Sequence, residues 1–277
     1  MAFLLVDRIT EIEPGVRARG DFTLPADLPD PSPCLLAEAV GQLAAWVAMA
    51  KAEFRSRPVA GIAGEVKFND MPVPGATFDL EVRLESCEAD SILYAGWACV
   101  GGMPIIELSR FVGPMLPMED FDDPQAVRKH FELLCGTDKP IQGFFTDAAL
   151  IPHLDIIDRD PAKRLRAKMS VPTSAAFFAD HFPRKPVLPG TLLLDAKVRI
   201  AARLAAEVLD PDRQILIRPT RIRNVKLRSF VHPGQMLEID AEILTTSDSS
   251  TEIALIAEAG GQRVSTARVE TGLRERS

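Results

Sequence analysis

The sequence predicts an α+β fold built from two copies of one unit. A strand segment and a long helix each occur twice, and the two copies lie at nearly constant spacing. VKFNDMPVPGATFDLEVRLE (66–85) is echoed by VKLRSFVHPGQMLEIDAEIL (225–244), so that Lys67 matches Lys226, 159 positions later. A repeat of this length indicates a duplicated structural unit.

Each copy of the strand segment turns at Pro-Gly and then alternates apolar with mostly charged residues. The turns are Pro74-Gly75 and Pro233-Gly234. Such alternation is the period of a half-buried strand. The apolar positions are Phe78, Leu80, Val82 and Leu84 in the first copy, and Leu237, Ile239, Ala241 and Ile243 in the second.

A long alanine-rich helix precedes these strands in each copy. Residues 34–54 align with 191–209, which places Glu38 on Asp195, 157 positions later. Both segments are too long for strands and are apolar in their first turns, so we expect them to be buried there. The start signals beside them are Pro33, Gly190 and Thr191.

The openings of the copies match more loosely, with Arg17-Ala18-Arg19 on Arg164-Leu165-Arg166 at a spacing of 147. The smaller spacing leaves ten extra residues in the second copy between its opening strand and its helix. HFPRKPVLPG (181–190) lies there, whereas the first copy has LPADLPDPSP (24–33) and no histidine. One copy therefore carries a histidine that the other lacks.

The predicted domain boundaries follow from this repeat. The first unit covers residues 1–118, a connector covers 119–146, and the second unit covers 147–277. Within the connector, Asp123-Pro124 begins a short helix that stops near Gly136.

Composition limits the classes of function. The 277 residues are 47% apolar and 26% charged, as in an ordinary soluble globular protein, and the formal charge of −7 argues against a nucleic-acid binder. The four cysteines have no metal-ligand spacing, so we expect reduced thiols and no metal. The N-terminus has no basic leader, and no stretch of about 20 apolar residues follows, so a cytoplasmic protein is expected.

His181 is the first residue of the segment with the clearest candidate catalytic residues. Fourteen positions later stands Asp195, and between them lie a proline-stiffened turn and Gly190 at a helix start. A histidine, a carboxylate and a backbone N–H at a helix N-terminus indicate an acid/base site beside an oxyanion pocket. Pro189 and Val187, in the same turn, are expected to contact substrate as well.

Three segments carry a resemblance to a known family. They are FLLVDRITEIEPG at the start, FFADHFPRKPVLPGTLLLDA in the middle and VKLRSFVHPGQMLEIDAEI after it. They resemble the hot-dog-fold β-hydroxyacyl-[acyl-carrier-protein] dehydratases, over most of both halves outside the connector. The resemblance implies a double hot dog, with two antiparallel sheets each wrapped around a long central helix.

In that family, each site combines a histidine from one unit with a carboxylate from the other. The resemblance therefore implies that His181 pairs with Glu38, and that Asp195 belongs to a degenerate second site. The implied activity is dehydration of (3R)-hydroxyacyl thioesters to trans-2-enoyl thioesters, with neutral His181 as base and protonated Glu38 as acid. The acyl group would be carried on the phosphopantetheine of an acyl carrier protein or of CoA, with no cofactor or metal.

Other interpretations stay open. A hot-dog thioesterase or a non-catalytic acyl or carrier-protein binding module would share the fold. Glu38 and Asp195 could be helix-start charges that the dipole stabilises. A homodimer through sheet edges is a further hypothesis, beyond the pseudo-dimer within one chain.

The remaining basic residues and histidines are not expected to take part in catalysis. The basic run is either a solvated strand face or a docking patch for an acidic carrier protein. The other histidines are expected at the surface. The run is Arg218, Arg221, Arg223, Lys226 and Arg228, and the histidines are His130, His153 and His232.

Overall fold

A computed structural model describes residues 3–28, 30–136, 153–210 and 216–274. Its first half comprises β1 (Arg8–Glu13), β2 (Arg17–Thr23), α1 (Cys34–Lys51), β3 (Ser56–Pro58), β4 (Ile62–Phe68), β5 (Thr77–Cys87), β6 (Ser91–Val100) and β7 (Met103–Pro117). The 3₁₀ helix η1 (Met118–Asp120) and the helix α2 (Pro124–Leu134) follow.

The second half repeats the order of the first, with one added helix and without a counterpart of β3 among the described residues. It comprises β8 (Leu154–Asp160), β9 (Arg164–Ser170), α3 (Phe177–His181), α4 (Gly190–Leu209), β10 (Leu216–Leu227), β11 (Met236–Thr246), β12 (Ser250–Ala259) and β13 (Gln262–Arg274). The added helix, α3, lies in the longer segment between opening strand and long helix, where the ten extra residues were predicted.

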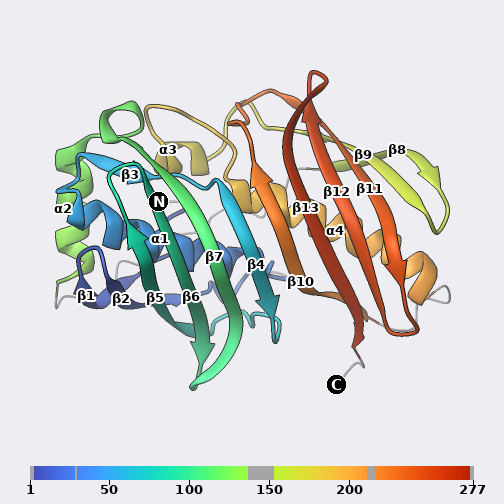
Figure 1. Cartoon of the computed structure of the whole chain (residues 1–277), viewed down its shortest axis with the longest axis horizontal. Helices are drawn as coiled ribbons and strands as arrows, with labels where there is room; N and C mark the ends of the chain where they lie inside the picture. Colours follow the sequence, from blue (N-terminus) through green and yellow to red (C-terminus); the bar gives the residue numbers. More distant parts are fainter. Residues whose placement is uncertain (1–2, 29, 137–152, 211–215, 275–277) are drawn as a thin grey trace.

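The strands form one antiparallel sheet in the order β1-β2-β5-β6-β7-β4-β10-β13-β12-β11-β9-β8, and β3 pairs with β7 (Figure 1). The expectation of two separate sheets is therefore wrong. The halves join where β4 pairs with β10, with Val66 opposite Ile222. This pairing satisfies the backbone groups of two strands that would otherwise be sheet edges.

The registers of the two halves correspond at the positions that the sequence repeat aligns, including its loosest part. Ala18 lies opposite Val82 in the first half, and Leu165 lies opposite Ala241 in the second, so the two openings hold the same place in their sheets. Gly75 and Gly234 both have φ +78°, a left-handed conformation that glycine adopts without strain.

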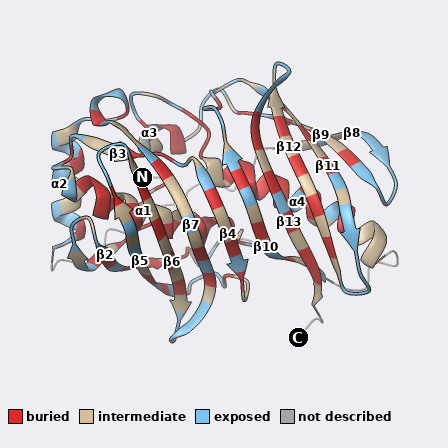
Figure 2. Ribbon diagram, in the orientation of Figure 1, coloured by how far each residue is buried: buried red, intermediate tan, exposed pale blue. Residues whose placement is uncertain are grey.

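The two long helices lie against the sheet and touch each other. α1 packs on β2, β5 and β6, α4 packs on β9 to β13, and α1 contacts α4 (Figure 1). Buried residues occupy both helices and alternate along the strands (Figure 2). The largely apolar first turns of both helices are buried, as the sequence indicated.

By length and composition, α1 could also cross a membrane, with a mean hydropathy of 1.3 over 18 residues. However, 67% of that window is buried inside the structure. The apolar composition of α1 is accounted for by its place in the core, and such a helix alone is weak evidence for a membrane span.

The connector contains the short helix that the sequence predicted. Asp123 accepts hydrogen bonds from the backbone N–H groups of Gln125 and Ala126, and α2 begins at Pro124 and ends at Leu134. Part of the connector, residues 137–146, lies outside the described residues. All four cysteines are free thiols, with Cys34 and Cys87 buried.

Candidate active site

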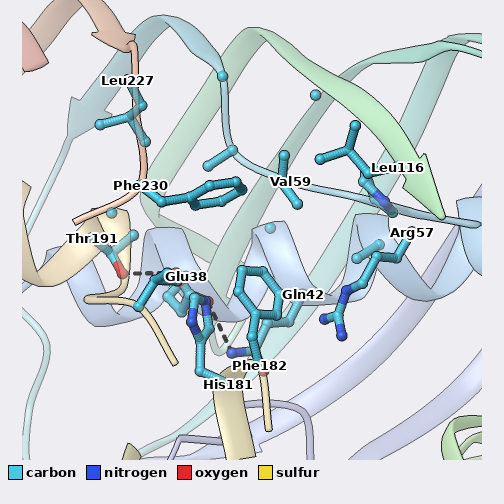
Figure 3. Close-up of a pocket in the computed structure, with 18 of the residues that line it drawn as sticks. Glu38, Gln42, Arg57, Val59, Leu116, His181, Phe182, Thr191, Leu227 and Phe230 are labelled. Carbon is cyan, nitrogen blue, oxygen red and sulfur yellow. Dashed lines mark hydrogen bonds between the residues drawn. The ribbon is translucent and has the colours of Figure 1, made fainter. Parts of the chain in front are cut away.

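A cavity of about 580 Å³ lies where α1, α3, the start of α4, β3 and the connector meet (Figure 3). Its walls include Glu38 from the first half and His181 and Gly190 from the second. Most of the remaining wall is apolar, as in a pocket for a chain-like ligand. The structure therefore brings the two predicted catalytic side chains to one cavity, although they are far apart in sequence.

Glu38, in the second turn of α1, is held by a hydrogen bond at each carboxylate oxygen. Thr191 Oγ1 donates to Oε2 at 2.7 Å, and Gln42 Nε2 donates to Oε1 at 2.9 Å (Figure 3). Thr191 belongs to α4, so the first bond joins the two halves at the site. Gln42 also donates to the Phe3 carbonyl oxygen at 2.9 Å, which ties the N-terminal segment to α1.

Burial raises the pKa of the Glu38 carboxyl above its ordinary value. The hydrogen bonds from Thr191 and Gln42 and the positive charge of Arg57 act to lower this pKa, but burial outweighs them. The direction is the one expected for a carboxyl that keeps its proton near neutral pH.

His181 ends α3 with its ring enclosed by aromatic side chains. The ring centroid lies 4.0 Å from that of Phe182 and 5.7 Å from that of Phe3, which meets it edge-on. Nδ1 is buried, and it makes no hydrogen bond of normal distance and angle to a described residue. The residue as a whole is half-buried and lines the cavity.

The pKa of His181 is lowered to about 3. Burial is the main cause, the positive charge of Arg57 adds to it, and the nearby backbone of Val187 acts in the opposite direction. The imidazole is therefore neutral at pH 7.

The start of α4 presents backbone N–H groups beside these side chains. Gly190 is its first residue and lines the cavity, and the first N–H groups of a helix have no intrahelical acceptor. A Cβ at position 190 would lie 2.6 Å from Leu227 Cδ1, so a larger residue would displace that side chain. Val187 lines the cavity, whereas Pro189 lies just before the helix and is not part of the wall.

Asp195 occupies a different environment, although it lies in the same helix. It is 4% exposed, does not line the cavity, and has Ser32 and Asp30 of the first half among its neighbours. Burial raises its pKa, and a hydrogen bond with Ser32 lowers it. Oδ2 is buried without a partner among the described residues. Asp195 thus faces the segment of the first half that lacks a histidine.

The basic run is divided by ion pairs. Arg221 and Arg223 each lie 3.7 Å from Glu65, and Arg223 also lies 2.7 Å from Glu270. Lys226 and Arg228 are exposed, and Arg228 lines the cavity. Much of the charge on the strand face is therefore neutralised, and Arg228 is the member of the run that reaches the site.

Sequence reasoning missed a cation on the cavity wall. Arg57, in β3, lies with its guanidinium carbon 4.4 Å above the Phe182 ring, and its Nη1 lies 3.8 Å from Asp122 of the connector. Burial lowers its pKa to about 10. No periodicity or motif marked Arg57, because only the docking of the connector onto α3 makes it part of the site.

The expectation of surface histidines holds for His153 and His232, which are exposed, but is wrong for His130. His130 is half-buried on the cavity wall, with its ring centroid 5.6 Å from that of Trp46. Burial lowers its pKa. The helix α2 therefore forms part of the cavity wall, which its place in a connector did not indicate.

Comparison with known proteins connects this geometry to a family. A family model described as ApeI-like, ApeI dehydratase, matches residues 158–266. The 3-hydroxyacyl-[acyl-carrier-protein] dehydratase FabZ of Ruminiclostridium cellulolyticum is 31% identical over 120 residues, which cover 41% of this chain and 84% of the relative. That of Anaeromyxobacter sp. strain K is 30% identical over 148 residues, 50% of this chain and 94% of the relative. A third FabZ, from Anaeromyxobacter sp. strain Fw109-5, is 35% identical over 105 residues, which cover 34% of this chain and 66% of the relative.

Solved structures resemble the whole chain. The tesB protein MAP1729c of Mycobacterium avium subs paratuberculosis has a TM-score of 0.63 at 13% identity, with 96% of this chain and 95% of that chain covered. An acyl-ACP thioesterase of Bacteroides thetaiotaomicron has a TM-score of 0.54 at 12% identity, with 92% and 97% covered. At such low identity, these likenesses show the hot-dog fold alone. Together with the FabZ relatives, they show that this chain belongs to the hot-dog family of 3-hydroxyacyl-[acyl-carrier-protein] dehydratases.

Proposed function

We propose that the protein dehydrates (3R)-hydroxyacyl thioesters to trans-2-enoyl thioesters, with His181 as base and Glu38 as acid. The observation that carries the proposal is that both side chains line one cavity, while Thr191 of α4 hydrogen-bonds Glu38 of α1 across the two halves. An acid from one half and a base from the other are thus held together by a contact between the halves.

The base step requires a neutral imidazole, which the low pKa of His181 supplies. Nδ1 is buried, so Nε2 is the nitrogen assigned to the substrate. In the proposed step, Nε2 takes the proton from C2, and the electron pair of the C2–H bond forms the new double bond to C3.

The acid step breaks the C3–O bond. Glu38, with a pKa raised by burial, gives its proton to the departing hydroxyl, which leaves as water. The site then holds protonated His181 and ionised Glu38, and one proton transfer between them restores the starting state. The N–H of Gly190, at the start of α4, is assigned to the negative charge that develops on the thioester oxygen.

We further propose that the chain is a double hot dog with one working site. The first unit covers residues 1–118, the connector 119–146 and the second unit 147–277. The repeated element order and the matching registers support this division. In this proposal, Asp195 is the acid of a second site that has lost its histidine.

The substrate is proposed to arrive on an acyl carrier protein or on CoA, with no cofactor or metal in the reaction. The acyl carrier protein is proposed because the names of the FabZ relatives include it. Of the proposed docking patch, Arg228 is exposed and lines the cavity. Lys226 is exposed beside it, whereas Arg221 and Arg223 are engaged by acids of the same sheet.

The test is an assay of the purified protein on 3-hydroxyacyl thioesters of several chain lengths. Formation of the conjugated enoyl thioester, abolished by His181→Ala and retained by the exposed control His232→Ala, is the expected result. Release of free thiol without enoyl product would instead identify a thioesterase. Tight acyl binding without turnover at any length would identify a binding module.

A further inference from the structure

The cavity contains a buried guanidinium for which the proposed dehydration has no use. Arg57 reaches the wall from β3, and only 14% of its side chain is exposed. In Figure 3, Thr191 and Arg57 lie toward opposite sides of the drawn site, with Glu38 and His181 between them. The guanidinium therefore lies beyond the reacting groups as seen from the start of α4, where the thioester is assigned.

The hydrogen-bonding capacity of Arg57 is largely unused. Nε is buried and has no partner among the described residues, and Nη1 reaches Asp122 at 3.8 Å, which is too long for a hydrogen bond. The guanidinium carbon lies 4.4 Å from the centroid of the Phe182 ring, and the side chain lines the cavity. An oxygen of a ligand in the cavity would give Nη1 the acceptor that Asp122, at 3.8 Å, does not provide.

The charges around Arg57 indicate which oxygen fits. Asp122 already provides a negative charge, 3.8 Å from Nη1. A carboxylate on the ligand would compete with Asp122, whereas a neutral acceptor would complete the hydrogen bonding without adding charge. Val59 and Leu116 provide apolar wall on the same side of the drawn site as Arg57 (Figure 3), so the rest of the ligand is a hydrocarbon chain.

We propose that Arg57 forms a subsite for a keto or hydroxyl oxygen carried by the acyl chain beyond C3. This inference rests on the proposed dehydration, and it makes the substrate class an oxygenated 3-hydroxyacyl thioester rather than a plain one. The thioester lies at the start of α4, the chain passes between Glu38 and His181, and the distal oxygen accepts from the guanidinium. The other arginine on the wall, Arg228, is exposed and is left for the carrier.

The experiment compares pairs of 3-hydroxyacyl pantetheine thioesters of equal length, one plain and one with a keto group at C5, C7 or C9. At the best position we expect the wild-type protein to favour the keto substrate by about 10- to 100-fold in kcat/KM, as for a hydrogen bond to a charged group. Arg57→Met should bring this ratio close to one. The matched control is Arg55→Met, because Arg55 is exposed and pairs only loosely with Glu53, and it should leave the ratio unchanged.

The ratio between two substrates in one variant cancels any change that Arg57→Met makes to the acid and the base. Equal losses for plain and keto substrates would assign Arg57 to the pantetheine or to the site as a whole, and would overturn the subsite. If Arg57→Met does not fold, the preference of the wild-type protein decides, since equal rates at every keto position would overturn the subsite too.

Binding of unreactive thioether analogues, measured by calorimetry, separates the two proposals. Keto-dependent binding that needs Arg57, with no dehydration of any substrate, would leave the subsite standing and refute the dehydratase. Dehydration of plain and keto substrates at equal rates would support the dehydratase and refute the subsite.

Discussion

Glu38 and Asp195 hold equivalent places in the two long helices, yet they have different surroundings. Glu38 lies on the cavity wall and accepts hydrogen bonds from Thr191 and Gln42. Asp195 is buried near Ser32, away from the cavity. The position of an acid in the repeat therefore does not decide its chemistry. What differs is the segment of the other half that faces it, since residues 171–189 contain α3 and its histidine, whereas residues 24–33 contain neither.

The largest expected effect on kcat comes from removing either member of the proposed catalytic pair, His181 or Glu38. His181→Ala and Glu38→Gln should each lower kcat for enoyl formation by roughly 100- to 10,000-fold, the usual contribution of a general acid or base. Asp195→Asn should stay within about threefold of the wild type, because Asp195 lines no part of the cavity. Steady-state kinetics on one 3-hydroxyacyl thioester measures all three variants. A loss with Asp195→Asn equal to that with Glu38→Gln would reverse the assignment of the acid.

The second difference between the helices is a buried lysine. Lys197 is fully buried and donates to Ser265 Oγ at 2.7 Å, where the first half has the buried Val40 and Ile106. Burial lowers its pKa from 10.5 to about 7. We expect Lys197→Met with Ser265→Ala to raise the free energy of unfolding by about 1 to 4 kcal/mol at pH 7, as when apolar side chains replace other buried charged groups.

The pH dependence of Lys197 has a definite sign. Between pH 7 and 10.5, the unfolded chain binds a proton at Lys197 that the folded chain has released, so the stability of the wild type rises with pH across this window. Urea unfolding at several pH values should show this rise in the wild type and lose it in the double variant. An identical pH dependence in both proteins would contradict a lowered pKa for Lys197.

A smaller effect is expected from the contact that ties Glu38 to the second half. Thr191→Val removes the hydrogen bond to Oε2 while it keeps the shape of the side chain, and we expect kcat to fall by about tenfold. That bond lowers the pKa of Glu38, so its loss raises the pKa. Since Glu38 must be protonated to act, the alkaline limb of the rate profile should move to higher pH. A profile unchanged in position would show that Thr191 does not act through Glu38.

The smallest effect is expected at the corresponding contact of Asp195. Ser32 Oγ accepts from the Cys34 backbone N–H at 3.1 Å at the start of α1. Ser32→Ala should cost about 1 kcal/mol of stability, as for loss of a helix cap, and leave kcat close to the wild-type value. Urea unfolding and the enoyl assay together measure this. A loss of kcat larger than that of Thr191→Val would mean that the segment 24–33 takes part in the reaction.

The fold was predictable where it depends on local pattern. The alternation after Pro74-Gly75 and Pro233-Gly234 and the apolar first turns of α1 and α4 each reflect burial of one face, so the sequence carries them directly. The joining of the halves into one sheet was not predictable, because pairing of β4 with β10 depends on which edges meet. For the same reason Arg57 and His130 went unnoticed, since they reach the cavity only through the docking of separate elements.

By itself, the sequence determined the repeat, the loop that carries His181, the missing histidine in the first copy and the two candidate acids. These are matters of residue type and spacing along the chain. Only the tertiary structure decided which acid shares a cavity with His181, how burial shifts the pKa values of Glu38 and His181, and that a buried arginine stands beyond them. Burial and distance between residues far apart in sequence are properties of the packed chain, and no local pattern encodes them.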